Sequence, residues 1–219
     1  MSFTLTEQPF HGFVRETIPG EKLLESIRLI DGNCPLLAYH QERIDRSRKL
    51  LFPKSGQLKL KNILAELELP ATGVYKLRLL YGEQLEESSI KAYEINVPRT
   101  IRLIDEPQIK YAKKYADRSA LESCFDRRGE CDDVLIIQHG FVTDTSYANV
   151  AFFDGNQWYT PSAPLLRGTR RAKLLREGTI RSAIIREKDI PLFKTVRLLN
   201  GMMNWAEAPV LEVERLVRI

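Results

Sequence analysis

A carboxylate and a glycine-led basic segment stand near the two ends of one stretch of this chain. The carboxylate is Asp144, and the basic segment is Gly168-Thr169-Arg170-Arg171, just where a helix is expected to begin. Free backbone N–H groups at a helix start attract anions, and a glycine lets the backbone approach a ligand closely. We interpret the segment as a candidate phosphate or carboxylate site. Taken alone, it also fits a glycine turn with solvated arginines.

An arginine in the segment HQERIDRS is a second candidate anion-binding group. Three- and four-residue spacing places His40, Arg43 and Ser47 on one face of a helix. The planar guanidinium of Arg43 could hold a phosphate through two N–H groups. Taken alone, the same spacing fits a solvated helix face.

Lysines 110, 113 and 114 gather before the middle of the chain. A lysine acts as the nucleophile of Schiff-base chemistry when a closed pocket lowers its pKa. Three lysines within five residues also fit a plain basic linker. Asp144, in turn, fits a carboxylate at a strand end that is satisfied by nearby N–H groups. The order of these groups along the chain is therefore more informative than any one of them.

Apolar periodicity predicts the elements that would position these groups. We expect helices over residues 38–53, 58–70, 120–129 and 169–178. We expect strands at 23–33, 74–82, 89–98, 100–105, 133–140, 141–146, 149–156, 157–161, 180–187 and 209–219. Residues 193–205 fit a helix or a turn-rich segment. Hairpins interrupted by single helices indicate an α+β fold in two halves.

Composition separates the two halves. Residues 106–119 are polar and rich in lysine, which favours a linker at 106–110 between a small N-terminal domain (1–105) and a C-terminal domain (111–219). The net charge of +4 is too mild for a nucleic-acid footprint. The three cysteines and three histidines lack metal-site spacing, so we expect a reduced, cytoplasmic protein without a metal. Residues 1–20 resemble neither a signal peptide nor a membrane anchor, and we expect no membrane association.

The chain resembles the class IV aminotransferases, which are pyridoxal-phosphate enzymes of fold type IV. That family holds branched-chain and D-amino-acid aminotransferases and 4-amino-4-deoxychorismate lyases. The resemblance runs from Glu25 to about Val210. It is carried by ESIRLIDG (25–32), HQERIDRS (40–47), KYADRSAL (114–121), TDTSYANVAFF (143–153), LLRGTRR (165–171) and NGMM (200–203).

The resemblance implies a role for each matching position. Arg43 would bind the phosphate of pyridoxal 5'-phosphate. Lys114 would form the Schiff base with the cofactor, with Lys113 as the alternative because a one-residue slip is easy. Asp144 would pair with the pyridine nitrogen, and Asn149 would be structural.

The two turn motifs would complete the cofactor site. By the resemblance, backbone N–H groups of Gly168, Thr169 and Arg170 would hold the phosphate. Gly201 and Met202 lie in NGMM, which resembles the Asn-Ala-Leu-Met of the lyases more than the phosphate turn of the transaminases. Together these motifs imply two α/β domains, as in D-amino-acid aminotransferase, with the cofactor in the cleft between them and a homodimeric assembly.

Several positions depart from the family pattern. Asp144 replaces a glutamate and is shorter by one methylene, and Ala151 and Thr169 replace commoner apolar or aromatic residues. The interval from Thr160 to Leu166 is one residue short of the usual pattern. These changes leave the cofactor site intact but weaken any transfer of substrate specificity.

Three functions follow from the resemblance. The short chain and NGMM favour a lyase that eliminates pyruvate from 4-amino-4-deoxychorismate to give p-aminobenzoate. The alternative is a transaminase for a branched-chain or D-amino acid, and the third is a catalytically silent homologue that binds the cofactor. In each case the ligand is a small amine or amino acid. Arg78, Tyr81 and Met202 are candidate substrate residues, although each also fits an ordinary strand or core position.

Overall fold

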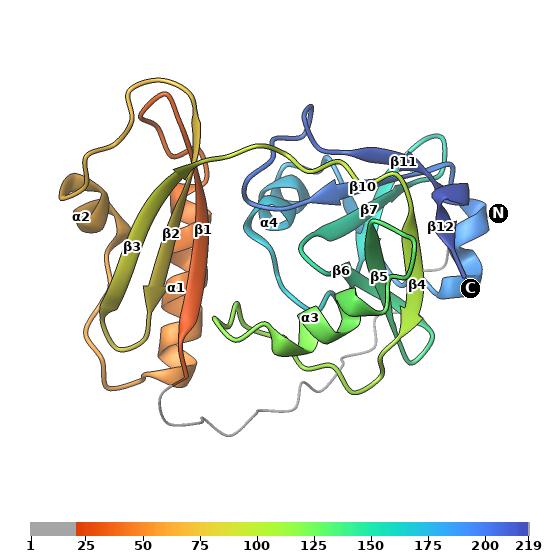
Figure 1. Cartoon of the computed structure of the whole chain (residues 1–219), viewed down its shortest axis with the longest axis horizontal. Helices are drawn as coiled ribbons and strands as arrows, with labels where there is room; N and C mark the ends of the chain where they lie inside the picture. Colours follow the sequence, from red (N-terminus) through yellow and green to blue (C-terminus); the bar gives the residue numbers. More distant parts are fainter. Residues whose placement is uncertain (1–20, 219) are drawn as a thin grey trace.

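The computed structural model describes residues 21–218, which form two sheets lying side by side with their helices (Figure 1). The expectation that residues 1–20 hold no signal peptide or anchor falls outside this range. Mixed sheets with few helices confirm the expected α+β class. Within the described residues, no helix has the length and apolar character needed to cross a membrane.

The first sheet is antiparallel, in the order β1-β2-β3, with bounds Leu23–Ile30, Val74–Tyr81 and Leu85–Ala92. Helix α1 (Leu37–Leu51) packs against it, and the short α2 (Leu60–Ala65) follows. Alternate residues point to opposite faces of a strand. Ile27, Leu77 and Ile44 are fully buried between the sheet and α1, which fixes the register of both elements.

The second sheet has the order β11-β10-β7-β6-β5-β4-β12, and β8 and β9 extend it from β7. Its core is apolar, with Leu135, Val150, Phe152 and Leu198 wholly buried. Two helices, α3 (Ser119–Asp126) and α4 (Thr169–Arg176), lie beside it. The strand bounds are β4 Ile101–Asp105, β5 Asp133–Gln138, β6 Phe141–Thr145, β7 Asn149–Phe153, β8 Trp158–Pro161, β9 Arg181–Ala183, β10 Thr195–Leu199, β11 Val210–Glu212 and β12 Leu216–Val217.

The segment expected to be a helix or turn-rich is wrong in its first half. Residues Thr195–Leu199 form β10, an inner strand that pairs with β7 on one side and β11 on the other. Val196 and Leu198 are buried, so the strand follows a period of two. The strand expected at 180–187 shrinks to Arg181–Ala183, and that at 209–219 is divided by a 3-10 turn, Val213–Arg215.

The boundary between the two sheets lies earlier than the composition suggested. Strand β4 pairs in parallel with β5 and with β12, so it belongs to the second sheet. The chain therefore crosses between the sheets within residues 93–100, upstream of the expected linker at 106–110. The domain bounds expected from the sequence, 1–105 and 111–219, stay a prediction, and the pairing of β4 places Ile101–Asp105 in the second sheet.

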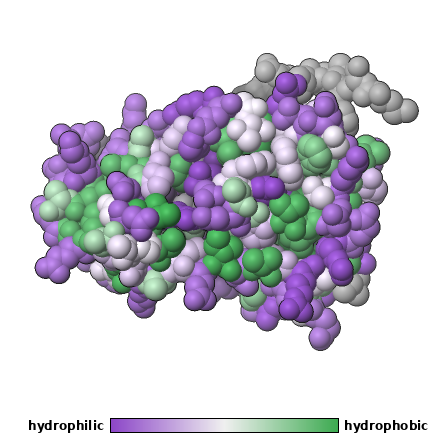
Figure 2. All heavy atoms as spheres, turned by 90° about the horizontal axis from the view of Figure 1, so that it is seen from above, coloured by the Kyte–Doolittle hydropathy of each residue, from purple (hydrophilic) through white to green (hydrophobic). Residues whose placement is uncertain are grey.

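The surface carries mixed charge interrupted by apolar patches. On the face shown in Figure 2, polar residues predominate and apolar side chains gather at several separate places. The large apolar side chains that remain exposed in the described residues are Leu50, Val97, Ile184, Leu192 and Val210.

Candidate active site

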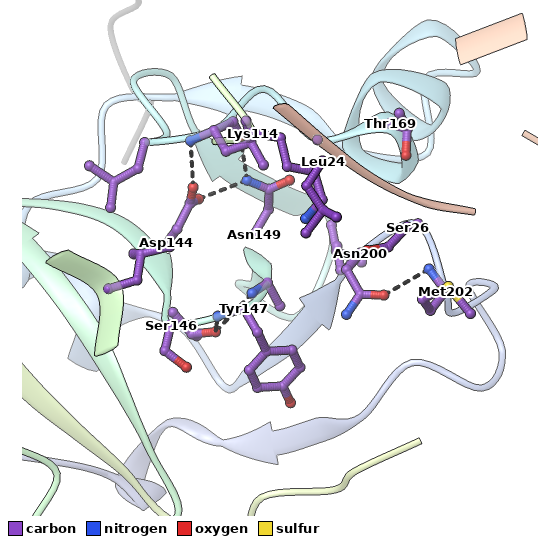
Figure 3. Close-up of a pocket in the computed structure, with 18 of the residues that line it drawn as sticks. Leu24, Ser26, Lys114, Asp144, Ser146, Tyr147, Asn149, Thr169, Asn200 and Met202 are labelled. Atoms are coloured by element: carbon purple, nitrogen blue, oxygen red, sulfur yellow. Dashed lines mark hydrogen bonds between the residues drawn. The ribbon is translucent and has the colours of Figure 1, made fainter. Parts of the chain in front are cut away.

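A cavity of about 360 Å³ lies between the two sheets, because its wall draws residues from both (Figure 3). Strand β1 contributes Leu24 and Ser26, which face the cavity by the period-two rule. Asp144 of β6 and Asn149 of β7 contribute from the second sheet. The chain segments that sequence analysis associated thus meet at one place.

Lys114 lies in the cavity wall, in the segment that leads into α3. Its carbonyl accepts a hydrogen bond from the backbone N–H of Leu24 at 2.8 Å, which ties this segment to β1. Burial, with a further contribution from the charge of Arg43, lowers the pKa of the Lys114 amine to about 7. An amine with that pKa is available as a nucleophile or base at neutral pH.

Asp144 presents a buried carboxylate to the cavity. It accepts hydrogen bonds from the Asn149 side-chain amide and from the backbone N–H of Leu166, both at 2.8 Å. Burial raises the pKa of Asp144 to about 6, although these two hydrogen bonds oppose the rise. A carboxylate with this environment favours a cationic partner.

The start of helix α4 forms a second wall of the cavity. Gly168 is the N-cap residue, and no side chain caps this helix start. The first backbone N–H groups of α4 have no partner within the helix and are available to a ligand. The Thr169 hydroxyl is buried and has no hydrogen-bond partner within the described structure. An anion at this position would satisfy both sets of donors.

Two glycines let the backbone close around this helix start. A Cβ added at Gly168 would lie 2.1 Å from Asn149 Oδ1, so only glycine fits beside that amide. A Cβ at Gly201 would lie 3.0 Å from Thr169 Oγ1 and 3.3 Å from the Ser26 carbonyl oxygen. The turn at Gly201 therefore abuts the first residue of α4.

Arg43 reaches the cavity wall from α1, where a buried ion pair holds it. Its Nε donates to Glu25 Oε1 at 2.8 Å, and its Nη2 donates to Glu25 Oε2 at 2.5 Å. His40 Nδ1 lies 2.6 Å from the same carboxylate. Burial opposes ionisation of Glu25, but the Arg43 charge and the His40 and Arg43 hydrogen bonds bring its pKa down to about 2.

Most residues selected from the sequence lie around the cavity. Those in its wall are Arg43, Arg78, Lys114, Asp144, Gly168, Thr169, Gly201 and Met202. Three others do not line it: Lys113, Tyr81 and Arg170. Tyr81 is buried on the opposite face of β2, and burial raises the pKa of its phenol.

Several polar residues of the cavity wall were not among those selected from the sequence. Lys76 and Arg118 line it, as do Tyr93, Tyr111 and Tyr147. Lys76 stands two residues before Arg78 on β2, so strand alternation could have placed both on one face. Arg118 lies four residues after Lys114, and it donates to the Ser146 carbonyl at 2.9 Å.

Residues 22–211 match the family described as amino-transferase class IV. A protein of Haemophilus influenzae without a functional name is 34% identical over 183 residues, covering 82% of this chain and 97% of that protein. A protein of Schizosaccharomyces pombe, provisionally named an aminodeoxychorismate lyase, is 29% identical and covers 83% of each chain.

Solved structures share the fold. A crystal structure from Haemophilus somnus 129pt, provisionally described as a 4-amino-4-deoxychorismate lyase, has a TM-score of 0.77 at 32% identity, covering 84% of this chain and 98% of that one. A hypothetical aminotransferase of Mycobacterium tuberculosis in its PLP-bound form has a TM-score of 0.70 at 17% identity, covering 97% and 90%. At that identity, the second comparison speaks for the fold alone.

Proposed function

The chain belongs to the class IV aminotransferase family, whose members are pyridoxal-phosphate-dependent enzymes, and from this premise we propose that it eliminates pyruvate from 4-amino-4-deoxychorismate to give p-aminobenzoate. One observation carries the proposal. Lys114, Asp144 and the start of α4 converge on a single cavity. Two relatives bear the provisional name of this lyase, and the matches cover 83% and 98% of their lengths.

The residues of the cavity fit pyridoxal phosphate at three points. The N–H groups at the start of α4 and the unpartnered Thr169 hydroxyl suit its phosphate. Asp144, whose pKa is raised by burial, suits its protonated ring nitrogen. Lys114, with its lowered pKa, suits its aldehyde.

Lys114 and Asp144 then each have a defined task. When bound, pyridoxal phosphate would supply an electron-accepting ring that stabilises negative charge on the substrate carbon bearing the amino group. Asp144 would hold the proton on the ring nitrogen. The Lys114 amine would remove the proton from the substrate carbon that bears the amino group. Breakage of the C–O bond to the enolpyruvyl group then leaves an aromatic ring.

Proton bookkeeping for this elimination closes within the site. Lys114 gains one proton from the ring carbon and returns one to the methylene carbon of the departing enolpyruvyl group. The products together contain the same atoms as the substrate, so the step requires no oxidant, reductant or second substrate. A transamination, in contrast, requires a keto acid to complete its cycle.

The charge of the cavity suits a substrate with two carboxylates. Lys76 and Arg78 lie two residues apart on the face of β2 that lines the cavity, and Arg118 lines it from the segment after Lys114. These cations stand in addition to the groups assigned to the phosphate. They favour a dianionic substrate over one with an apolar side chain.

The test is incubation of the cofactor-loaded protein with aminodeoxychorismate alone. We expect pyruvate and p-aminobenzoate in equal amounts without any added keto acid, and no product from Lys114→Ala. Turnover that depends on an amino acid and a keto acid would instead make the protein a transaminase. A cofactor absorbance band without either activity would make it a silent homologue.

A further inference from the structure

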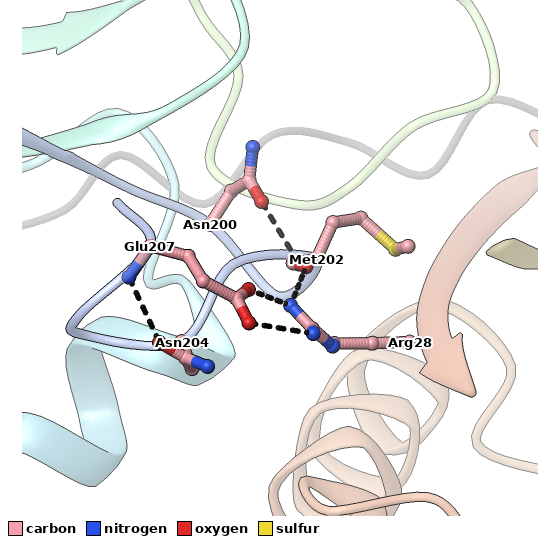
Figure 4. A network of polar contacts seen from close by, with 5 residues as sticks. All are labelled: Arg28, Asn200, Met202, Asn204 and Glu207. Carbon is pink, nitrogen blue, oxygen red and sulfur yellow. Dashed lines mark hydrogen bonds and ion pairs between the residues drawn. The ribbon is translucent and has the colours of Figure 1, made fainter. Parts of the chain in front are cut away.

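The turn that abuts the start of α4 is held from the other sheet by one buried arginine. Arg28 of β1 is only 5% exposed, and its guanidinium reaches the loop that follows β10. Its Nη1 donates to the Met202 carbonyl oxygen at 2.8 Å (Figure 4). Both guanidinium amino groups also donate to the carboxylate of Glu207, and the contact from Nη2 measures 3.0 Å. The Arg28 guanidinium therefore links Met202 and Glu207, which lie at two separate points of the loop 200–207.

The remaining contacts make this loop a defined shape rather than a flexible strap. The Asn200 side-chain oxygen accepts from the Met202 N–H at 2.8 Å, and the Asn204 side-chain oxygen accepts from the Glu207 N–H at 2.9 Å. Trp205 packs edge to face on Trp158, with centroids 5.1 Å apart. Met202 is thus fixed at its N–H from within the loop and at its carbonyl from β1.

Charge explains why a carboxylate must meet Arg28. Arg28 stands directly opposite Lys76 in the β1–β2 register, and like charges at such positions repel. Arg28 is also close enough to Arg170 that its charge, after burial, lowers the pKa of that guanidinium. Glu207 offsets this concentration of positive charge, and its hydrogen bonds to Arg28 lower its own pKa.

We propose that Arg28 is a positioning residue that acts through the pair with Glu207. The pair sets the Gly201–Met202 turn against the start of α4 and so shapes the phosphate end of the cavity from the opposite sheet. Arg28 and Glu207 hold the turn through these contacts whatever the cavity binds. The consequence for cofactor binding rests on the proposed function.

A matched control exists in the same chain. Arg176 of α4 donates through two nitrogens to the carboxylate of Glu42 on α1, at 3.1 and 3.0 Å. This pair also joins the first half of the chain to the second, but both side chains are more than half exposed and neither lines the cavity. Glu42→Ala therefore removes another ion pair between the two halves of the chain and leaves the Gly201–Met202 turn untouched.

The first measurement needs no cofactor. The chain contains two tryptophans, Trp158 and Trp205, and both lie in this cluster. In Glu207→Ala we expect the tryptophan emission to shift to longer wavelength and acrylamide quenching to increase about twofold, because the loop loses its tether to β1 and Trp205 becomes more exposed to solvent, although Arg197 still donates to the Trp205 carbonyl. Glu42→Ala should retain the wild-type spectrum. Unchanged quenching in Glu207→Ala would overturn the positioning role, whatever the protein binds.

The second measurement separates the phosphate end from the rest of the site. Pyridoxal 5'-phosphate and pyridoxal, which lacks the phosphate, are titrated against wild type, Glu207→Ala and Arg28→Lys. We expect both variants to lose about tenfold in affinity for the phosphorylated form, as for one charge-assisted contact. Affinity for pyridoxal should change less than about twofold. Arg28→Lys keeps the charge, so it tests the two-pronged geometry where loss of the buried arginine would endanger folding.

Two results would contradict the proposal. Equal losses for both ligands would indicate general loosening, and unchanged affinity for the phosphorylated form would show that the turn does not shape that end. If wild type binds neither ligand, the proposed function fails while the fluorescence result still decides whether Arg28 and Glu207 hold the loop.

Discussion

Arg43 and Lys114 line the same cavity, and the charge of the arginine adds to burial in lowering the pKa of the lysine amine to about 7. An amine with the usual lysine pKa of about 10.4 would be unprotonated in roughly one molecule in 2,500 at pH 7. At a pKa of about 7, roughly half the molecules carry a free amine. The phosphate-binding candidate therefore also prepares the nucleophile.

Replacement of Lys114 by alanine should remove the covalent attachment of the cofactor. After addition of pyridoxal phosphate and reduction with borohydride, wild type should carry a stable label on the peptide that contains Lys114. Lys114→Ala should carry none, and its turnover should fall by about a thousandfold or more, since it loses both nucleophile and base. Mass spectrometry of the digested protein provides the measurement.

Lys113 is the matched control for this experiment. It neighbours Lys114 in sequence but does not line the cavity. Lys113→Ala should keep the label at Lys114 and most of its turnover. A label that persists in Lys114→Ala, or that is lost in Lys113→Ala, would mean that Lys113 rather than Lys114 forms the Schiff base.

Asp144 should make the stability of the cofactor-free protein depend on pH. Burial raises its pKa to about 6, above the value of about 3.9 for an unfolded aspartate. Between these values the folded protein holds a proton that the unfolded chain has lost, so stability falls as pH rises from about 4 to 6 and then levels. Denaturant unfolding should show that wild type, relative to Asp144→Asn, loses stability across this window.

The exposed Asp126 at the end of α3 provides a control with the same change of charge. Asp126→Asn should keep the wild-type profile between pH 4 and 6. An identical profile in Asp144→Asn, or a difference of opposite sign, would mean that Asp144 is not the buried group responsible.

Glu25→Gln should destabilise the protein, because it leaves Arg43 buried without its counterion. Removal of one partner from a buried pair costs about 3–5 kcal/mol, and Glu25 and Arg43 are both almost wholly buried. The folded pKa of Glu25, about 2, is below the unfolded value. Its contribution is therefore present above about pH 4.3 and is lost as pH falls through 2.

Chemical denaturation at neutral pH measures this effect. Glu42 lies on α1, as Arg43 does, and forms an exposed ion pair with Arg176 of α4. Glu42→Gln weakens this exposed pair and should leave the unfolding midpoint unchanged. If Glu25→Gln is as stable as Glu42→Gln, the buried pair does not stabilise α1 against β1.

Local sequence patterns were sufficient for α1, for the separate strands β1 and β2 and for the strands around Asp144, because each buries one face over several residues. They failed for β10, whose short run Thr195–Leu199 is buried by pairing on both sides rather than by a long alternation. They also failed for the sheet boundary. The placement of β4 depends on a parallel pairing of Ile101 with Asp133, which no local composition reveals.

The cavity wall shows the same division between local and long-range information. Tyr81 stands three residues from Arg78 on β2, and an odd offset places two strand residues on opposite faces. Alternation alone would thus have excluded Tyr81 and included Lys76. The link between Arg28 and the loop 200–207 joins residues more than 170 positions apart, so only the folded structure could supply it.

Gly168→Ala should disturb the cofactor site through Asn149. Gly168 has φ −69° and ψ 149°, a conformation that alanine adopts freely, so backbone strain is not the issue. The added Cβ would instead lie 2.1 Å from Asn149 Oδ1. Asn149 must then move, and its amide leaves both Asp144 Oδ1 and the Leu166 carbonyl. We expect a loss of about 1–3 kcal/mol in unfolding free energy and weaker binding of pyridoxal phosphate.

Gly56→Ala separates this steric effect from the general effect of replacing glycine. A Cβ at Gly56 meets no atom within 4 Å, and that residue lies in the loop between α1 and α2. Gly56→Ala should match wild type in denaturant unfolding and in cofactor titration, or be slightly more stable because the unfolded chain loses freedom. If Gly168→Ala behaves like Gly56→Ala, Asn149 can repack without cost, and the close approach of α4 to β7 is not what holds Asp144 in place.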